Sequence, residues 1–299
     1  MLASRKLSLC LLFLTVFMGL SAAAVFLLDR GPDSEQLALR QESLSGEPQA
    51  AFDRADYELL NSLPGLTFRV SEGRLLDVRY RDPGPDPAVE IAADEVLAVE
   101  LDSSSWPPLF ADLYVQGLQV TLLSTALPSW LRRLRGDGRL AYVLHPESDT
   151  LEVRQLSLQA EDLGRLDLAA VLDSIVASDI AGSLPAAKLS TMTLDFRDGG
   201  LFDLTLADLA RSEGIGEAPM RRQLIAMTQV LEAEAGTPIL RETLGAIRAI
   251  ADHEGGGQAL QMTATPSKPF PLKDLDRIRG YPLPNLGMLN RLNLRIDLD

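Results

Sequence analysis

Residues 151–172 read LEVRQLSLQAEDLGRLDLAAVL, and apolar side chains occupy alternate positions through most of this stretch. A period of two is typical of a β-strand that buries one face and leaves the other in water. The apolar members of the alternation are Leu151, Val153, Leu156, Leu158, Leu166, Leu168 and Ala170. Gly164 falls between the two halves, so the stretch predicts a pair of antiparallel strands.

The same period dominates outward from this pair, from Leu66 to Phe196. Glycine and proline clusters divide the alternating segments, as turns do. The clusters that we interpret as turns are Asp82-Pro83-Gly84-Pro85, Gly136-Asp137-Gly138, Pro146, Gly164 and Asp198-Gly199-Gly200. This part of the chain is therefore predicted to be an antiparallel β-meander, half-buried, with one wet face.

The alternation changes phase at Val96/Leu97, at Gly117/Leu118 and at Gln155/Leu156. In the first of these the apolar set passes from Ile91 and Ala93 to Leu97 and Val99. A slip of one residue sends the apolar set to the wrong face unless a β-bulge absorbs it. Each site is either a bulge that curves one strand or a tight joint between two strands, and the sequence leaves both open.

A helical period replaces the strand period after Leu201. Helices are predicted over 202–212, 219–235 and 238–252, within a helical block at 201–254. The second and third helices each carry a single apolar stripe, which must cover a sheet or another helix. We expect these stripes to line an apolar groove, with Leu224, Met227, Leu231, Leu240, Leu244 and Ile247 as the candidate lining residues.

Strand patterns return at 259–265 and at Leu292, Leu294, Ile296 and Leu298. The predicted fold class is therefore α+β, a curved antiparallel meander with a three-helix block inserted before the C-terminal strands. A short helix is also expected over 51–63, ahead of Pro64-Gly65.

The N-terminal segment from Leu7 to Leu28 contains no charged residue. At 1.5 Å per residue it is long enough for a hydrocarbon core of about 30 Å. Arg5 and Lys6 precede it, so the positive-inside rule predicts a cytoplasmic N-terminus and an exported domain. A signal peptide cleaved near Ala22-Ala23-Ala24 is the alternative. Residues 29–50 read as a flexible tether, which leaves 51–299 as the exported domain.

The formal net charge is −14, which disfavours nucleic-acid binding and flat adsorption on an anionic lipid surface. Arg132, Arg133 and Arg135 form the one basic cluster, and we interpret it as a solvated helix end. Cys10 is the only cysteine and falls in the apolar segment, so the exported domain has no disulfide or thiol chemistry.

The sequence offers little for catalysis or metal binding. His145 and His253 are the only histidines and lie far apart in the chain. No P-loop, nucleophile elbow, HExxH or dinucleotide-binding motif occurs. We therefore expect no enzyme activity, no cofactor and no metal site.

The order of these parts resembles the AsmA-like family of bacterial envelope proteins. The resemblance rests on the N-terminal anchor, on the strand–turn–strand pattern from Ile91 to Leu122 and on the meander from Leu151 to Leu172. It implies a β-rich groove, anchored in the bacterial inner membrane with its main domain in the periplasm, that serves lipid movement or envelope homeostasis. The helical block departs from that pattern, and no functional residue is carried over.

Two hypotheses from different classes follow. In the first, a curved apolar sheet face flanked by helices binds acyl chains or a hydrophobic partner segment. In the second, the protein has a structural role and docks another envelope protein through its helical block or a sheet edge.

Overall fold

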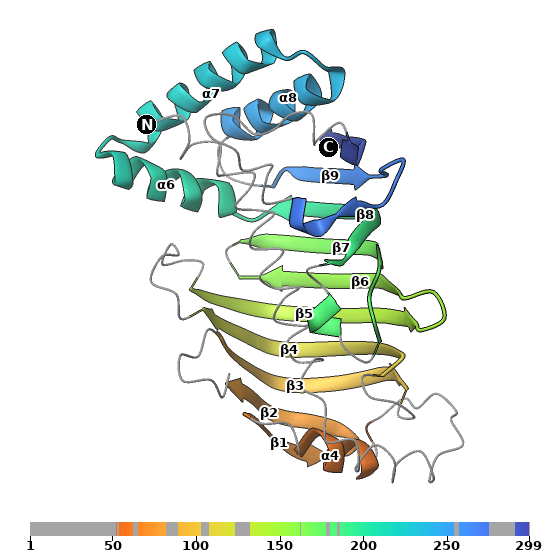
Figure 1. Ribbon diagram of the computed structural model, residues 1–299. Helices are drawn as coiled ribbons and strands as arrows, with labels where there is room; N and C mark the ends of the chain where they lie inside the picture. The colour runs from red at the N-terminus through yellow and green to blue at the C-terminus, as the bar shows by residue number, and fades with distance from the viewer. Residues whose placement is uncertain are drawn as a thin grey trace.

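The computed structural model of the chain describes residues 52, 54–61, 65–81, 89–102, 108–122, 132–161, 163–177, 180–183, 186–253, 257–274 and 291–298 (Figure 1). The predicted anchor and tether lie outside these residues. The strands are β1 (Leu66–Ser71), β2 (Arg74–Arg81), β3 (Val89–Leu101), β4 (Phe110–Leu122), β5 (Arg133–His145), β6 (Thr150–Ala160), β7 (Gly164–Asp173), β8 (Lys188–Asp198), β9 (Ala259–Ala264), β10 (Phe270–Pro271) and β11 (Leu294–Leu298). The helices are α4 (Arg54–Asn61), α5 (Ile180–Ser183), α6 (Leu201–Glu213), α7 (Glu217–Glu234) and α8 (Pro238–Asp252).

All eleven strands belong to one antiparallel sheet in the order β1-β2-β3-β4-β5-β6-β7-β8-β9-β11, with β10 paired to β8. Consecutive strands are neighbours, so the predicted meander is confirmed. The three helices α6, α7 and α8 interrupt it between β8 and β9, which still pair with each other. In Figure 1, α7 and α8 lie above β9 and α6 lies to its left, at the opposite end of the sheet from β1.

The sheet has two long rims where its strands begin and end. We name them after the ends of β5: the Arg133 rim, on the left in Figure 1, and the His145 rim. Strands β2, β4, β6 and β8 end at the Arg133 rim, and α6 leaves the sheet there. Phe52 enters at the His145 rim, where its N–H donates to Gly73 O in the β1–β2 turn at 3.2 Å.

Two of the three predicted phase changes are β-bulges within continuous strands. The register of β4 against β5 shifts between Val115 and Leu118, and that of β6 against β7 shifts between Val153 and Leu156. Gly117 has φ 61°, a left-handed conformation that glycine adopts without a Cβ clash. The alternative of two strands with a tight joint is excluded at both places.

The third phase change was predicted at the wrong place. Val96 pairs with Val115 and Ala98 with Leu113, and the register shift comes between Ala98 and Glu100. Val96 and Ala98 therefore face the core, whereas Val99 is 38% exposed on the other face. The prediction failed because Leu97 and Val99 lie on the wet face although both side chains are apolar.

The prediction of a turn at Gly136-Asp137-Gly138 is wrong, because these residues lie in the interior of β5. Gly136 pairs with Ala160, and a Cβ at Gly136 would overlap the carbonyl oxygen of Gln159. The Asp137 carboxylate accepts the Gly117 N–H at 2.9 Å. The glycines therefore allow β6 to approach closely, and the aspartate satisfies a backbone donor freed by the neighbouring bulge.

The prediction that the basic cluster forms a helix end is also wrong. Arg133 and Arg135 are the first and third residues of β5, and both side chains are exposed on the wet face. Leu134 between them faces the other way and is 4% exposed. Buried and exposed side chains therefore alternate here as in any strand, but three arginines among four residues obscured this alternation in the sequence.

The predicted last strand is confirmed as β11, which pairs along its length with β9. Leu294 is buried, Ile296 and Leu298 are half-buried, and Leu292 is buried just before the strand. Leu292, Leu294 and Ile296 pack with Leu194, Phe196 and Phe270 in the cluster that closes this end of the sheet. The helical block is confirmed over α6, α7 and α8, with Gly214 in left-handed conformation ending α6.

Replacing Gly136 by alanine tests the close approach of β5 and β6. Gly136→Ala forces a methyl group into the Gln159 carbonyl, so we expect a loss of about 3 kcal/mol in the free energy of unfolding. Gly236→Ala is the matched control, because its Cβ meets nothing within 4 Å. Denaturant unfolding of both variants measures this, and equal stabilities would show that β6 does not approach Gly136 closely.

Candidate functional site

One face of the sheet carries three continuous rows of apolar residues, which run across eight strands at right angles to the chain direction. Each member of a row pairs directly with the next. The central row is Ala98, Leu113, Leu140, Leu156, Leu168, Leu194, Met262 and Ile296. The His145-side row is Leu101, Ala111, Tyr142, Val153, Ala170, Met192, Ala264 and Leu294. The Arg133-side row is Val96, Val115, Gly138, Leu158, Leu166, Phe196, Leu260 and Leu298.

We call these three rows together the apolar face. Neighbouring strands are about 4.8 Å apart, so seven spacings give the face a length of roughly 34 Å. A lipid acyl chain fills about half of a hydrocarbon core of roughly 30 Å. The apolar face is therefore longer than a single acyl chain, and its long axis follows the sheet and not the strands.

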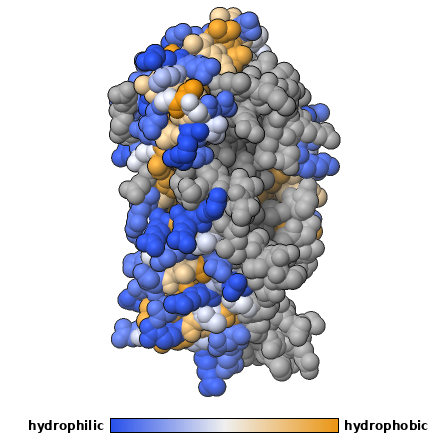
Figure 2. Space-filling model, turned by 90° about the vertical axis from the view of Figure 1, so that its left-hand side faces the viewer, coloured by the Kyte–Doolittle hydropathy of each residue, from blue (hydrophilic) through white to orange (hydrophobic). Residues whose placement is uncertain are grey.

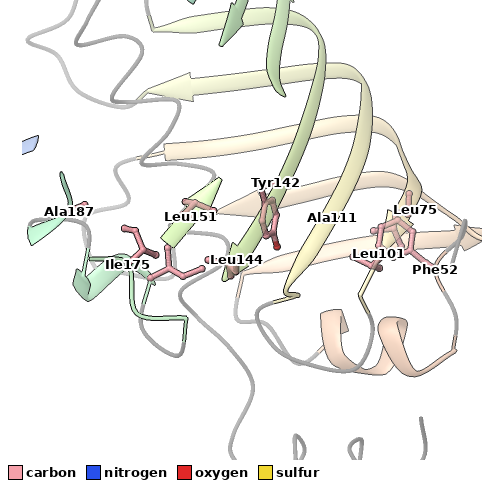
Figure 3. Close-up of a cluster of buried hydrophobic side chains, with 11 residues drawn as sticks. Phe52, Leu75, Leu101, Ala111, Tyr142, Leu144, Leu151, Ile175 and Ala187 are labelled. Atoms are coloured by element: carbon pink, nitrogen blue, oxygen red, sulfur yellow. The ribbon is translucent and has the colours of Figure 1, made fainter. Parts of the chain in front are cut away.

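The apolar face is covered unevenly. In the His145-side row all members but Val153 and Met192 are buried. The segment between β7 and β8 packs against this side, with Ile175 and Ile180 each 1% exposed and Ala187 fully buried. Figure 3 shows Ile175 beside Leu144 and Leu151, with Ala187 on its other side. The Arg133-side row is more open, because Phe196 alone among its members is buried and the other seven are half-buried.

Tyr142 is the one polar group in the three rows. It is 3% exposed, and its hydroxyl donates to Pro108 O at 3.1 Å. Burial raises the pKa of Tyr142, and the negative charge of Asp102 raises it further. The side chain therefore stays a neutral phenol at physiological pH, and the apolar face carries no charge at this position.

The opposite face carries charged and polar pairs across neighbouring strands. Arg139 donates to both carboxylate oxygens of Asp112, at 2.9 and 2.6 Å, and its guanidinium lies 4.8 Å from the centre of the Tyr114 ring. The Asp112 carboxylate raises the pKa of Arg139. Ser157 donates to Asp167 at 2.6 Å, and Arg165 pairs with the same carboxylate. The sheet thus separates a wet charged face from an apolar one.

The helical block has a core of its own. Phe202, Leu206, Ala210, Met220, Leu224 and Ala251 form one buried cluster, with half-buried Met227 against it. Arg221 holds the block together, because it pairs with Asp203 at 2.5 Å and donates to Ala251 O and His253 O at 2.8 Å each. The helix stripes therefore pack largely on each other, and α8 also contacts β11.

The six candidate lining residues have different positions. Leu224 and Met227 belong to the helix cluster, Leu231 is half-buried on α7, and Leu244 is 4% exposed on α8. Leu240 and Ile247 belong to α8, but their side chains lie outside the described residues. A groove lined by these six residues stays a prediction. The three rows, which sequence reasoning did not assemble, form a larger apolar surface.

The two histidines are far apart in the structure as well. His145 lies at the end of β5, 3.4 Å from Glu152 and 3.7 Å from Glu147, and His253 follows α8. Within the described residues, no three histidine, cysteine or acidic side chains gather in a metal-binding group. None of the helices in the described part of the chain is long and apolar enough to cross a membrane.

A family model described as "Uncharacterized protein" matches residues 157–297, just under half of the chain. The match runs from within β6 to β11 and so includes the helical block. No curated protein and no solved structure matches the chain significantly.

The pKa of Asp167 leads to a pH test of the wet face. Burial alone would raise this pKa, but hydrogen bonds from Arg165 and Ser157 outweigh burial and lower it. The carboxylate therefore stabilises the fold above the unfolded-state pKa of about 3.9, and this contribution is lost as the pH falls through the lower folded-state pKa. We expect Asp167→Asn to cost about 1 kcal/mol at pH 7, since Arg165 is largely exposed, and the deficit to disappear in acid.

Urea unfolding between pH 7 and pH 2 measures the deficit. Asp297→Asn is the control, because Asp297 is an exposed carboxylate on the same face without an ion-pair partner among the described residues. A deficit of Asp167→Asn that stays constant down to pH 2 would contradict the assigned role.

Proposed function

We propose that the chain is a non-enzymatic protein of the bacterial envelope that binds lipid acyl chains along its apolar face. The observation that carries this proposal is the set of three apolar rows, which continue without a charged residue across eight strands. An ordinary sheet core needs a covering layer along its whole length. All members of the Arg133-side row except Phe196 are only half-buried, which leaves contact area for an apolar ligand.

The N-terminal sequence supports the location in this proposal. Leu7–Leu28 would anchor the chain in the inner membrane with the N-terminus cytoplasmic, and the domain from residue 51 would lie in the periplasm. The likeness of the sequence pattern to AsmA-like proteins agrees with a β-rich lipid-binding role. A lipid that leaves the bilayer could then move along a track whose rows run the length of the sheet.

Adjacent residues on opposite faces of β6 provide the test. A photo-crosslinking amino acid at Leu158 lies on the apolar face, and the same group at Gln159 is exposed on the wet face. In living cells we expect phospholipid adducts from position 158 and at most about a tenth as many from position 159. Mass spectrometry of the purified adducts identifies the lipid.

The two positions share the same strand and nearly the same depth in the envelope, so the face of the sheet on which they lie is the main difference between them. Equal acyl-chain adducts at both positions, or none at position 158 in a folded protein, would refute lipid binding on this face. Protein adducts at position 158 in place of lipid would favour the role of docking another envelope protein.

A further inference from the structure

Four exposed arginines on the wet face near the Arg133 rim have no ion-pair partner among the described residues: Arg79, Arg133, Arg135 and Arg197. Other arginines on this face are mostly neutralised, as Arg139 is by Asp112 and Arg165 by Asp167. Figure 2, which views this rim, shows hydrophilic residues along most of its described length. The rim therefore presents four guanidinium groups that no described carboxylate neutralises directly, in a chain that is acidic overall.

Three of these arginines form one patch with polar neighbours. The cross-strand pairs Arg79–Ala92, Ala92–Gln119 and Gln119–Arg135 set Arg79 and Arg135 three strands apart, roughly 14 Å. Arg133 pairs with Thr121 two residues further along the strands. The two arginines of β5 therefore lie directly opposite the Gln119 amide and the Thr121 hydroxyl of β4. We call Arg79, Gln119, Thr121, Arg133 and Arg135 the basic patch.

The acidic residues near the basic patch offset part of its charge. Glu90 already pairs with Arg81 at 3.1 Å, and Asp137 accepts the Gly117 N–H. Glu161, opposite Arg135 at the start of the β6–β7 turn, and Asp94, beside Gly117, are further acids nearby, but neither forms an ion pair with the three arginines. Guanidinium groups flanked by neutral donors are suited to phosphate groups, which accept several hydrogen bonds and carry negative charge.

The His145 rim has the opposite character. Glu147 and Asp149 lie exposed in the turn after β5, Glu152 follows at the start of β6, and Glu100 lies near the end of β3. The basic residues near this rim include Arg74, which pairs with Glu95, and the lysines Lys188, Lys268 and Lys273 around β10. Near a negative surface the domain therefore experiences a torque that turns the Arg133 rim toward that surface.

We infer that the basic patch docks the domain, rim first, on the anionic phospholipid headgroups of the membrane that anchors it. The net charge opposes flat adsorption, but only the rim approaches in this orientation, and the acidic rim stays several Debye lengths away. A strand as long as β5, with 13 residues, separates the two rims by about 40 Å. The Debye length at physiological ionic strength is only roughly 8 Å.

The chain between anchor and domain is long enough for this orientation. The chain reaches the sheet at Phe52, on the His145 rim. When the Arg133 rim contacts the membrane, the tether must therefore span the width of the sheet. Residues 29–50 reach up to roughly 75 Å when extended. The inference rests on the proposed anchor, and the tether raises the effective concentration of the patch at the membrane, so that weak contacts are sufficient.

Fluorescence quenching in lipid nanodiscs tests the docked orientation. The full-length chain, with Cys10→Ser, is reconstituted through its N-terminal segment into discs of phosphatidylcholine alone or of equal parts phosphatidylcholine and phosphatidylglycerol. Each disc also contains a lipid with a spin-labelled headgroup, which quenches nearby fluorophores. The fluorophore is attached through Gln119→Cys in the basic patch or through Ser148→Cys at the His145 rim.

We expect strong quenching at position 119 in phosphatidylglycerol discs, little in phosphatidylcholine discs, and little at position 148 in either. Arg133→Gln with Arg135→Gln should lower the ratio of docked to undocked domain roughly thirty-fold, given the attraction of each arginine to an anionic surface. Arg222→Gln with Arg295→Gln is the matched control. Both arginines are exposed, away from the patch, and without an ion-pair partner among the described residues, so quenching should persist.

Equal quenching at positions 119 and 148, equal quenching in both discs, or equal loss in both double variants would overturn the docked orientation while leaving the anchor and the apolar face intact. Failure of the chain to enter either disc would remove the proposed anchor and overturn this inference with it. Lipid adducts at Leu158 that persist without quenching at position 119 would show lipid binding without rim docking.

Discussion

The register of the antiparallel sheet is the constraint on which the rest of the structure depends. A shift of one residue between any two strands would break all three apolar rows at that point and send charged side chains to the apolar face. The bulges in β4 and β6 absorb the shifts that the sequence demands, and so keep Leu118 and Leu156 on the same face as Val115 and Val153. The separation of a wet face from an apolar face follows from this register.

The same register explains the odd composition of β5. Gly136 lets β6 approach, and Asp137 satisfies the N–H of Gly117 in the bulge. Arg133 and Arg135 continue the wet face to the rim, while Leu134 packs with Tyr80 and Val120 on the other side. One strand therefore adjusts the curvature of the sheet, closes its core near the rim and presents charge to the solvent.

Much of the fold could be predicted from the sequence because its signals are local. The alternation from Leu151 to Ala170 predicted two strands. The phase changes at Gly117 and Gln155 located two irregularities, but only the structure decides between a bulge and a tight joint. Gly136-Asp137-Gly138 was misinterpreted because glycine clusters usually mark turns. Here Gly136 is needed because the backbone of Gln159, on the neighbouring strand, leaves no room for a Cβ. The candidate residues on α7 and α8 came from helix stripes, but a row such as Ala98 to Ile296 depends on seven registers that no local pattern reveals.

A structure of the full-length chain, extracted with its surrounding membrane lipid by a detergent-free polymer, tests the central claim most directly. The account predicts elongated lipid density along the apolar face, in contact with Leu158 and Leu166 of the half-buried Arg133-side row. An apolar face fully covered by the chain's own side chains, with no room for an acyl chain beside these two leucines, would contradict it.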